Sequence, residues 1–346
     1  MIWLTWRQLR TQTLTAVAIL AAAAVYLLIT GTQLRDSYNS DLATCGQTGT
    51  CSDALNGLQS RYNGPLDLVG LLLMAAPVLI GIFWGAPLIA GELERSTHYL
   101  VWNQSATRTR WLATKLALVG LASVATAGLL SLLVTWWASP LDTFSGSRWG
   151  TETFDTRDIA PLGYAAFAFA LGVTLGLLTR RALTAMAATL AIFIAAQVLV
   201  SADIRPNLLP TTTIAVPVNQ ATMSQALRFD RSAAVTGPVT IDLPTPYGSW
   251  VLSQTPALDS SGRVIQTSEI LTCWSRGLVT GAAGKGAASG LGPLGACLAP
   301  ENLHVEITYQ PAGRYWQLQW IETALYTILA ALLAAVCFWR IGKLRG

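Results

Sequence analysis

Six apolar stretches, separated by polar segments, run along the chain from near its start to near its end. A helix needs roughly 20 apolar residues to cross a bilayer, and only the first and fourth stretches fall slightly short of that length. The pattern predicts six transmembrane helices, at residues 14–30, 66–90, 112–138, 161–178, 182–202 and 316–339. The first stretch is not expected to be a cleaved signal, because no small-residue cleavage site precedes a polar segment.

The polar segments predict an orientation. With the N-terminus inside, the inner segments are 1–13, 91–111, 179–181 and 340–346, and the outer segments are 31–65, 139–160 and 203–315. The inner segments, together with Lys115, hold eleven of the 22 Lys and Arg residues. The positive-inside rule therefore predicts a multi-pass plasma-membrane protein with both termini in the cytoplasm.

Composition agrees with lipid as the main solvent. The chain is 52% hydrophobic and 12% charged, whereas a soluble domain carries about 25% charged residues. The basic residues are scattered or flank the spans, which does not indicate nucleic-acid binding. The prediction is an all-α polytopic membrane protein.

Residues 2–12 form an amphipathic pattern before the first span. Ile2, Trp6 and Leu9 share one helical face, and Arg7 lies roughly opposite. This pattern predicts an N-terminal interfacial helix that lies on the inner membrane surface. The alternative is a cytoplasmic extension of the first span.

The last outer segment is long enough to be a small domain. It contains short strand-like runs, TIAVPV, PVTIDL and HVEITY, between prolines and glycines. Such punctuation predicts a small extracellular domain rich in strands and loops between the fifth and sixth helices. The expected division is 1–202 for the first five helices, 203–315 for the extracellular domain and 316–346 for the sixth helix and cytoplasmic tail.

Four cysteines fall in outer segments and none falls on the inner side. Cys45 and Cys51 lie in the first outer segment, and Cys273 and Cys297 lie in the last. In an oxidising exterior we expect the disulfides Cys45–Cys51 and Cys273–Cys297. Unpaired thiols are the alternative.

The sequence holds no arrangement typical of a catalytic or metal site. His98 and His304 are predicted on opposite sides of the membrane, and no metal-ligand spacing occurs. Walker, dinucleotide-binding and nucleophile-elbow motifs are also missing. We expect no enzyme activity, cofactor or metal in this chain, so the energy for any active transport must come from another chain.

Few polar residues lie within the apolar stretches. Glu322 is about two turns into the sixth helix, where a carboxylate is costly and is a candidate for the transport pathway or a gate. A structural or gating role and a direct contact with substrate or proton are both open. Gln197 is expected to form an interhelical hydrogen bond. Pro77 and Pro87 are expected to kink the second helix.

The inner segment 91–111, GELERSTHYLVWNQSATRTRW, combines charges with aromatic residues. Tyr99 and Trp102 could anchor it in a groove of a soluble partner, with the flanking charges setting the register. The alternative is a tight turn whose tryptophans lie at the membrane interface. Composition alone leaves both interpretations open.

Three stretches resemble actinobacterial permease subunits of type-2 ABC exporters. They are MIWLTWRQLRTQ at the start, FWGAPLIAGELERSTHYLVWNQSATRTRWLATK at Phe83–Lys115, and YQPAGRYWQLQWIETALY at Tyr309–Tyr326. The resemblance implies the six-helix fold of one exporter half, with 2–12 as a connecting helix and the loop after the second span as a coupling helix. The Arg95-Ser96 pair departs from the small residue or glycine usual in that family.

The resemblance also implies a mechanism and partners. The loop would transmit ATP-driven closure from a separate ATPase through Glu92, Glu94, Arg95, Thr97, His98, Tyr99, Trp102, Gln104, Arg108 and Arg110. Two ATPase subunits would bind ATP and Mg²⁺, and a second permease copy or a related chain would complete the pathway in the lipid bilayer. The substrate is not indicated.

Two functions of other classes compete with a permease. One is a non-transporting, membrane-anchored binding or assembly protein that acts through its extracellular domain. The other is a membrane-embedded enzyme, which the missing catalytic motifs disfavour. Copurification of an ATPase would separate a permease from an anchored binding protein.

Overall fold

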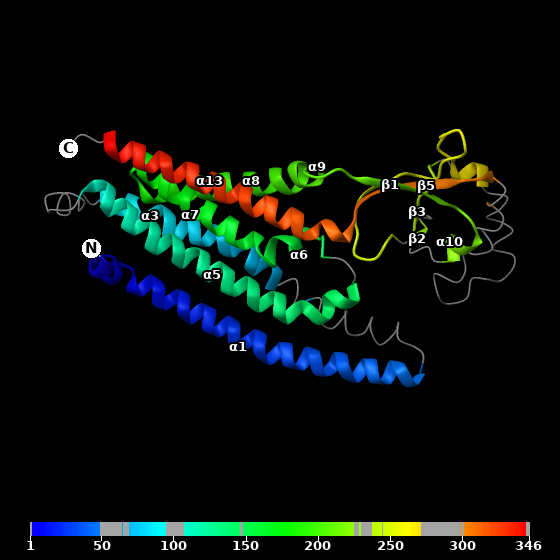
Figure 1. Ribbon diagram of the computed structural model, residues 1–346, viewed down its shortest axis with the longest axis horizontal. Helices are drawn as coiled ribbons and strands as arrows, with labels where there is room; N and C mark the ends of the chain where they lie inside the picture. Colours follow the sequence, from blue (N-terminus) through cyan, green and yellow to red (C-terminus); the bar gives the residue numbers. More distant parts are fainter. Residues whose placement is uncertain are drawn as a thin grey trace. The chain divides into compact units, whose positions relative to one another are not determined.

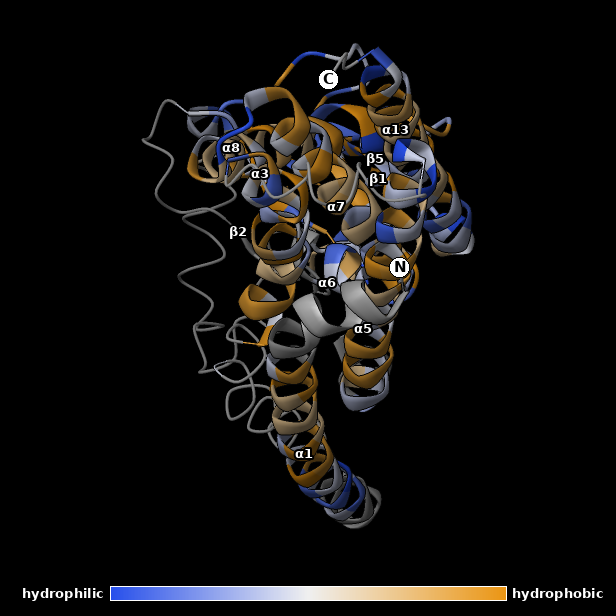
Figure 2. Ribbon diagram, turned by 90° about the vertical axis from the view of Figure 1, so that its left-hand side faces the viewer, coloured by the Kyte–Doolittle hydropathy of each residue, from blue (hydrophilic) through white to orange (hydrophobic). Residues whose placement is uncertain are grey.

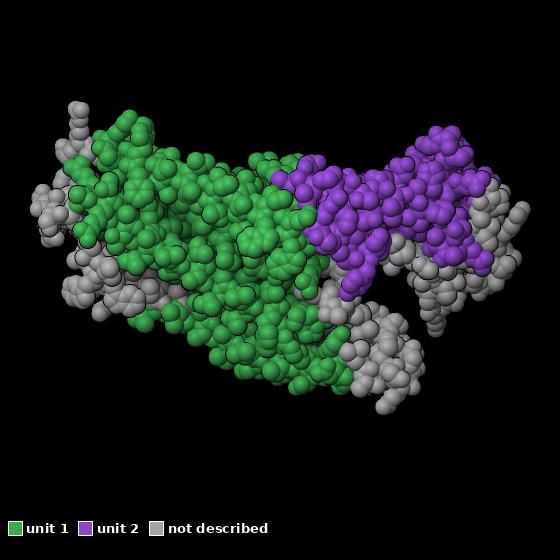
Figure 3. Space-filling view, in the orientation of Figure 1, with its two compact units in different colours: residues 1–205, 315–346 green, residues 206–314 purple. Residues whose placement is uncertain are grey.

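The chain divides into two compact units (Figure 3). The computed structural model describes residues 2–48, 64, 69–94, 107–145, 148–224, 228–229, 237–243, 245–270, 298 and 301–343. Unit 1 comprises residues 1–205 and 315–346, and unit 2 comprises residues 206–314. Unit 1 is helical in its described part, whereas the strands lie in unit 2.

The described residues contain six helices that are long and apolar enough to cross a membrane. They are Val17–Ser40, Val69–Glu94, Arg108–Pro140, Ala160–Thr179, Ala182–Asn207 and Ala312–Lys343. Each overlaps one predicted stretch, which confirms the six expected spans in their expected order. Several helices extend beyond the apolar stretch, because hydropathy marks the lipid-facing length and helical hydrogen bonding continues past it.

Helix α1 (Ile2–Thr48) is continuous where two helices were expected (Figure 1). No break separates residues 2–12 from the first span, so the expectation of a separate N-terminal interfacial helix is wrong. The alternative, an extension of the span, describes the backbone. The helix is continuous because no proline or glycine occurs before Gly31, so no residue in 2–30 interrupts the i→i−4 hydrogen bonds.

The second span contains a turn of π-helix. Residues 69–80 are α-helical, η1 (Gly81–Gly85) is π-helical, and α3 (Ala86–Glu94) completes the span. The Ala86 N–H donates to the carbonyl oxygen of Gly81. Pro87 follows directly and has no N–H to donate. The irregularity expected at Pro87 is therefore a widened turn just before it, whereas the helix stays regular across Pro77.

The rest of unit 1 is arranged around α7 (Ala160–Thr179) (Figure 1). The other elements are α5 (Arg108–Ser145), α6 (Thr151–Thr156), α8 (Ala182–Leu199), η2 (Val200–Ile204), α9 (Arg205–Asn207) and α13 (Tyr315–Lys343). In α7, 72% of the apolar window is buried within the chain, against at most 39% in any other span. Helix α7 is thus the centre of the bundle.

The surrounding helices expose apolar side chains. Leu72, Leu121, Leu183 and Ile328, each from a different span, are all more than half exposed. Figure 2 shows such apolar residues along the helices of the bundle. A soluble protein seldom exposes contiguous apolar surface of this extent, so the faces suit a lipid environment.

Small residues let α7 approach the second span closely. A Cβ atom added to Gly81 would lie 2.6 Å from the carbonyl oxygen of Ala168, and one added to Gly176 would lie 2.5 Å from that of Ala86. A Cβ atom on Gly172 would collide with the carbonyl oxygen of Gly81. Backbones this close require small side chains at helix–helix interfaces in membranes.

Unit 2 contains a small antiparallel sheet with strand order β1-β5-β4. The strands are β1 (Thr212–Pro217), β4 (Trp250–Gln254) and β5 (His304–Gln310), and Ile214 lies opposite Ile307. A two-stranded sheet pairs β2 (Arg228–Phe229) with β3 (Ile241–Asp242), and α10 (Gln220–Ser224) precedes it. The runs TIAVPV and HVEITY thus form strands, while PVTIDL contributes only the short β3.

Unit 2 has its own apolar core. Val305 and Ile307 of β5 are completely buried, and they cluster with Met223 and Ile241. In β1, exposed residues alternate with partly buried ones. This alternation is typical of a sheet with one face on a core and the other in water.

Candidate functional site

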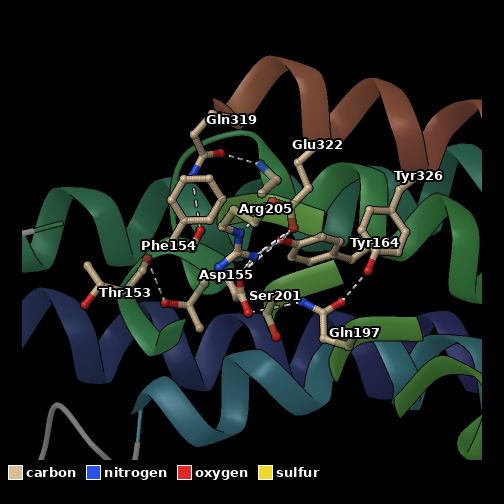
Figure 4. A network of polar contacts seen from close by, with 12 residues as sticks. Thr153, Phe154, Asp155, Tyr164, Gln197, Ser201, Arg205, Gln319, Glu322 and Tyr326 are labelled. Carbon is tan, nitrogen blue, oxygen red and sulfur yellow. Dashed lines mark hydrogen bonds and ion pairs between the residues drawn. The ribbon is translucent and has the colours of Figure 1, made fainter. Parts of the chain in front are cut away.

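Charged and polar side chains meet in the interior of unit 1 (Figure 4). We call the following set the buried ionic cluster: Asp155 of α6, Tyr164 of α7, Gln197 of α8, Arg205 of α9, and Glu322 and Tyr326 of α13. Asp155 is 3% exposed, Arg205 1% and Glu322 0%. Five elements that are distant in the sequence therefore contribute to one polar site.

Arg205 is the cation of the cluster. Its Nε donates to Glu322 Oε2 at 2.7 Å, and its Nη2 donates to Glu322 Oε1 at 2.8 Å. Nη2 also forms an ion pair with Asp155 Oδ1. The guanidinium carbon lies 4.2 Å from the centroid of the Phe154 ring. The planar fork of arginine suits this two-point pairing, which lysine could not reproduce.

Neutral groups complete the hydrogen bonding of the two carboxylates. The Tyr164 hydroxyl donates to Glu322 Oε1 at 2.6 Å and lies 3.2 Å from Asp155 Oδ1. Gln197 Nε2 donates to Asp155 Oδ2 at 3.1 Å, and the Tyr326 hydroxyl donates to Gln197 Oε1 at 3.0 Å. The interhelical hydrogen bond expected of Gln197 is confirmed, with partners on α6 and α13.

A tight turn between α6 and α7 places Asp155 in the cluster. Asp158 has a positive φ of 60°, a conformation that aspartate tolerates better than most residues. Pro161 lies in the first turn of α7, where the missing N–H of a proline costs no helical hydrogen bond. Gln319 fastens this turn to α13, because its Oε1 accepts the Ala160 N–H at 2.9 Å and its Nε2 donates to the Phe154 carbonyl oxygen at 3.1 Å.

The cluster has unusual electrostatics for a buried site. Burial raises the pKa of the Asp155 carboxyl above its ordinary value, although the charge of Arg205 opposes the rise. Removing two carboxylates and one guanidinium from water costs several kcal/mol per ion, which pairing and hydrogen bonds must offset. The arrangement can fasten α6, α9 and α13 to one another, and it can accept a proton.

Sequence reasoning found part of this cluster. The sequence indicates Glu322 as a candidate, and it is completely buried against Arg205. The predicted topology places Asp155 and Arg205 in outer segments, and nothing in the sequence distinguishes Tyr164. The signal in the sequence is that a carboxylate within a span needs a cation at similar depth, and Arg205 lies three residues after the end of the fifth apolar stretch.

At the opposite end of the spans, Glu92 connects the second span to the third. Its Oε1 accepts a hydrogen bond from Lys115 Nζ of α5 at 2.5 Å. Lys115 is 3% exposed, and its Nζ lies 4.7 Å from the centroid of the Trp111 ring. A lysine this buried needs such a partner, so the pair fixes the two helix ends on either side of the segment 95–106.

Glu94 connects the second span to the fifth. Its Oε2 accepts the N–H of Ala182, the first residue of α8, at 3.2 Å. A carboxylate at a helix N-terminus satisfies a free N–H group and favours the helix dipole. Arg180 has a left-handed φ of 54°, which closes the short turn between α7 and α8.

The other predicted coupling residues divide into two groups. Arg108 and Arg110 begin α5, and the Arg110 N–H donates to Thr107 Oγ1 at 3.3 Å. The rest lie outside the described residues: Arg95, Thr97, His98, Tyr99, Trp102 and Gln104. Their role stays a prediction.

The predicted disulfides also stay predictions. Cys51, Cys273 and Cys297 lie outside the described residues, and Cys45 lies in α1 at a position whose side chain is not described. The remaining cysteine, Cys337, is free and buried. Its Sγ lies 3.2 Å from Thr174 Oγ1. Among the residues the structure describes, no group of three or more His, Cys, Asp or Glu could hold a metal ion.

Comparison with known proteins identifies a family. The model of a family described as ABC-2 membrane transporter related matches residues 17–205, which is more than half of the chain. Neither a curated protein nor a solved structure matches the chain in these comparisons. The matched residues end at Arg205, so they include three further members of the buried ionic cluster, Asp155, Tyr164 and Gln197, and they exclude α13 with Glu322.

Proposed function

Because the chain belongs to the ABC-2 membrane transporter related family, we propose that it is the permease subunit of an ATP-driven exporter. Permeases without an ATPase domain are typical of this family, and the family implies ATPase partners in general. The six candidate spans make the chain a multi-pass membrane protein. In the proposed complex, two ATPase subunits bind ATP and Mg²⁺. A second permease copy or a related chain completes the pathway.

The family match carries the proposal, and the geometry at the end of α3 supports its coupling step. Glu92 pairs with Lys115 of the third span, and Glu94 caps the fifth span. A force applied by an ATPase to residues 95–106 would therefore reach three spans through two carboxylates that lie one and three residues before this segment. Residues 92–110 are proposed as the ATPase contact, with Trp102 as an aromatic anchor.

The proposal includes an orientation. Both termini face the cytoplasm of the plasma membrane, as the distribution of arginines favours, and unit 2 is extracellular. In that compartment the pairs Cys45–Cys51 and Cys273–Cys297 would be oxidised, and closing the loop of the second pair would stabilise unit 2 by about 3 kcal/mol. Mass mapping of non-reduced peptides would test this, and four free thiols in the native protein would refute it.

In this proposal Glu322 belongs to the gate and does not bind substrate directly. Its oxygens receive hydrogen bonds from Arg205 and Tyr164 and are not exposed. The substrate itself is not identified by any described contact. A competing function, an anchored binding or assembly protein, would use unit 2 and would need no ATPase.

Copurification of the full chain from native membranes in mild detergent tests the proposal. An ABC ATPase should copurify in a fixed ratio with the wild-type chain. Trp102→Ala should weaken that association by about 2 kcal/mol, as truncation of a buried interface aromatic does. Trp320→Ala is the matched control, because Trp320 is 63% exposed on α13, and it should keep the ATPase. A wild-type chain that brings down no ATPase would favour the anchored binding protein.

A further inference from the structure

The buried ionic cluster holds one more carboxylate than its cation can balance. Asp155 and Glu322 both pair with Arg205, and none of the three is more than 3% exposed. If both carboxyls were ionised, the three charges would sum to −1 in a site removed from water. A buried carboxyl in that situation takes up a proton instead of keeping an uncompensated charge.

In the described contacts, the other groups around the cluster do not neutralise its excess negative charge. From the packed elements, Tyr164 of α7, Gln197 of α8 and Tyr326 of α13 are neutral partners. Asp203 of η2 is exposed and would add negative charge. Arg157, which follows α6, is buried and has contacts of its own, and the variant Arg157→Gln tests its contribution.

The hydrogen bonds distinguish the two carboxyls. Glu322 receives three donors, the Nε and Nη2 of Arg205 and the hydroxyl of Tyr164. Both oxygens of Glu322 therefore receive a hydrogen bond from the guanidinium of Arg205. Asp155 Oδ1 pairs with Arg205 and lies 3.2 Å from the Tyr164 hydroxyl, whose single proton points to Glu322 at the shorter distance of 2.6 Å. The partner of Asp155 Oδ2 is the neutral amide of Gln197. Oδ2 is therefore the oxygen at which a proton can be held.

Gln197 can serve either state of Asp155. Its amide presents a donor nitrogen and an acceptor oxygen that exchange places on a half-turn of the side-chain end. After that turn, Oε1 would accept the Asp155 proton and Nε2 would donate to the Tyr326 oxygen. The Tyr326 hydroxyl lies 3.5 Å from the Ala196 carbonyl oxygen, to which it would then donate. Each buried group thus has a partner in both states.

We propose that the buried ionic cluster is a proton-binding site, in which Asp155 Oδ2 takes the proton and Gln197 turns to accept the hydrogen bond. One proton from water adds to one oxygen lone pair, and the charge of the cluster changes from −1 to zero. The raised pKa of Asp155 agrees with this assignment. The ion pair with Arg205 keeps the proton exchangeable, because it favours the ionised form.

Infrared difference spectroscopy tests the site on the purified full chain in lipid nanodiscs. Between acidic and alkaline buffer, the wild-type chain should lose the carbonyl band of a protonated carboxylic acid, and that band should shift in D₂O. Asp155→Asn should lack the band. The matched control is Asp158→Asn, because Asp158 lies on the same segment and accepts the Tyr315 hydroxyl at 2.6 Å; the control should keep the band. Arg157→Gln should also keep it.

Thermal unfolding of the same samples identifies which carboxyl holds the proton. Asparagine imitates a protonated aspartic acid, so Asp155→Asn should match wild type in acidic buffer and should lack the part of the pH dependence that the cluster contributes. Glu322→Gln removes the two-point partner of Arg205 and should be less stable than wild type throughout. A wild-type chain with no protonated-carboxyl band would overturn the proposal even if a variant failed to fold. A carbonyl band that survives in Asp155→Asn would also overturn the proposal. The same holds if Glu322→Gln, and not Asp155→Asn, has the unfolding temperature of the acidic wild type. The measurement needs no ATP and no partner, so its outcome is independent of the proposed function.

Discussion

Arg205 and Glu322 form a two-point ion pair although 117 residues separate them in the sequence. Nearly all of the intervening residues belong to unit 2. The chain leaves the helical unit after Arg205 and re-enters it at Tyr315, and the ion pair connects the helix at the point of exit to the helix that begins at the point of re-entry. Local sequence cannot produce such a contact, which depends on the assembled bundle.

Removing Arg205 should destabilise the helical unit strongly. In Arg205→Met both Asp155 and Glu322 lose their cation while they stay buried, and breaking a buried pair from one side costs about 3–5 kcal/mol. Thermal unfolding of the full chain in detergent would measure the loss. Arg263→Met is the control, because Arg263 is exposed and pairs with Asp259 and Glu269 at the surface, where ion pairs contribute little to stability. Equal effects of the two variants would contradict the importance of the cluster.

Gly172→Ala should separate α7 from the second span. The new Cβ atom would collide with the Gly81 carbonyl oxygen, and overpacking of this kind costs about 1–3 kcal/mol. At Gly128 of α5 the nearest atom to an added Cβ is 3.6 Å away, in the Leu162 side chain. Gly128→Ala should therefore be neutral or stabilising by up to about 1 kcal/mol, because alanine favours helix. Unfolding temperatures of both variants check the pair, and a harmless Gly172→Ala would argue against the close approach.

An acid-sensitive turn is expected in unit 2. Hydrogen bonds from the Ser261 hydroxyl and the Arg263 N–H lower the pKa of Asp259 to about 2, and the N–H of Gln266 and the side chain of Arg263 lower the pKa of Glu269. Because the folded pKa values lie below the unfolded ones, the stabilisation is present above about pH 4 and is lost as the pH falls toward about 2.

The variant Asp259→Asn isolates that effect. Asparagine cannot ionise, so the variant should unfold at a lower temperature than wild type at neutral pH, and the difference should shrink on acidification. Asp242→Asn, on the two-stranded sheet, supplies a comparison of an exposed aspartate at another site. A gap between wild type and Asp259→Asn that stays constant down to about pH 2 would contradict the prediction.

Glu94→Ala should weaken coupling without preventing assembly. The variant removes the acceptor for the Ala182 N–H, and loss of a carboxylate cap costs about 1 kcal/mol of local stability. Within the proposed function, ATPase copurification should persist while substrate-stimulated ATP hydrolysis falls. Glu94→Gln keeps a neutral acceptor and should be intermediate. Full stimulation in Glu94→Ala would show that the contact between α3 and α8 does not transmit the signal.

The spans could be predicted from the sequence because each apolar stretch is about as long as a bilayer is thick. Glu322 could also be selected, since a charge within a span is costly. Its partners could not, because Asp155 reaches the cluster through the turn at Asp158, and local composition does not determine where that turn leads. The close approach at Gly172 and Gly176 has a recognisable spacing, but spacing does not name the partner helix. The prediction of a separate N-terminal helix is wrong because an amphipathic pattern does not require a break in the helix.

The contact between α7 and the second span limits how the bundle can move. Helices separated by large side chains can slide by small steps as those side chains change rotamer, whereas here a carbonyl group of one helix occupies the space above a glycine of the other. Small shifts would bring backbone atoms into collision. Close-packed interfaces of this kind therefore switch between discrete arrangements and do not deform gradually. The second span and α7 should therefore move together as one rigid body. Any opening of the bundle must take place at the interfaces between this pair of helices and its other neighbours.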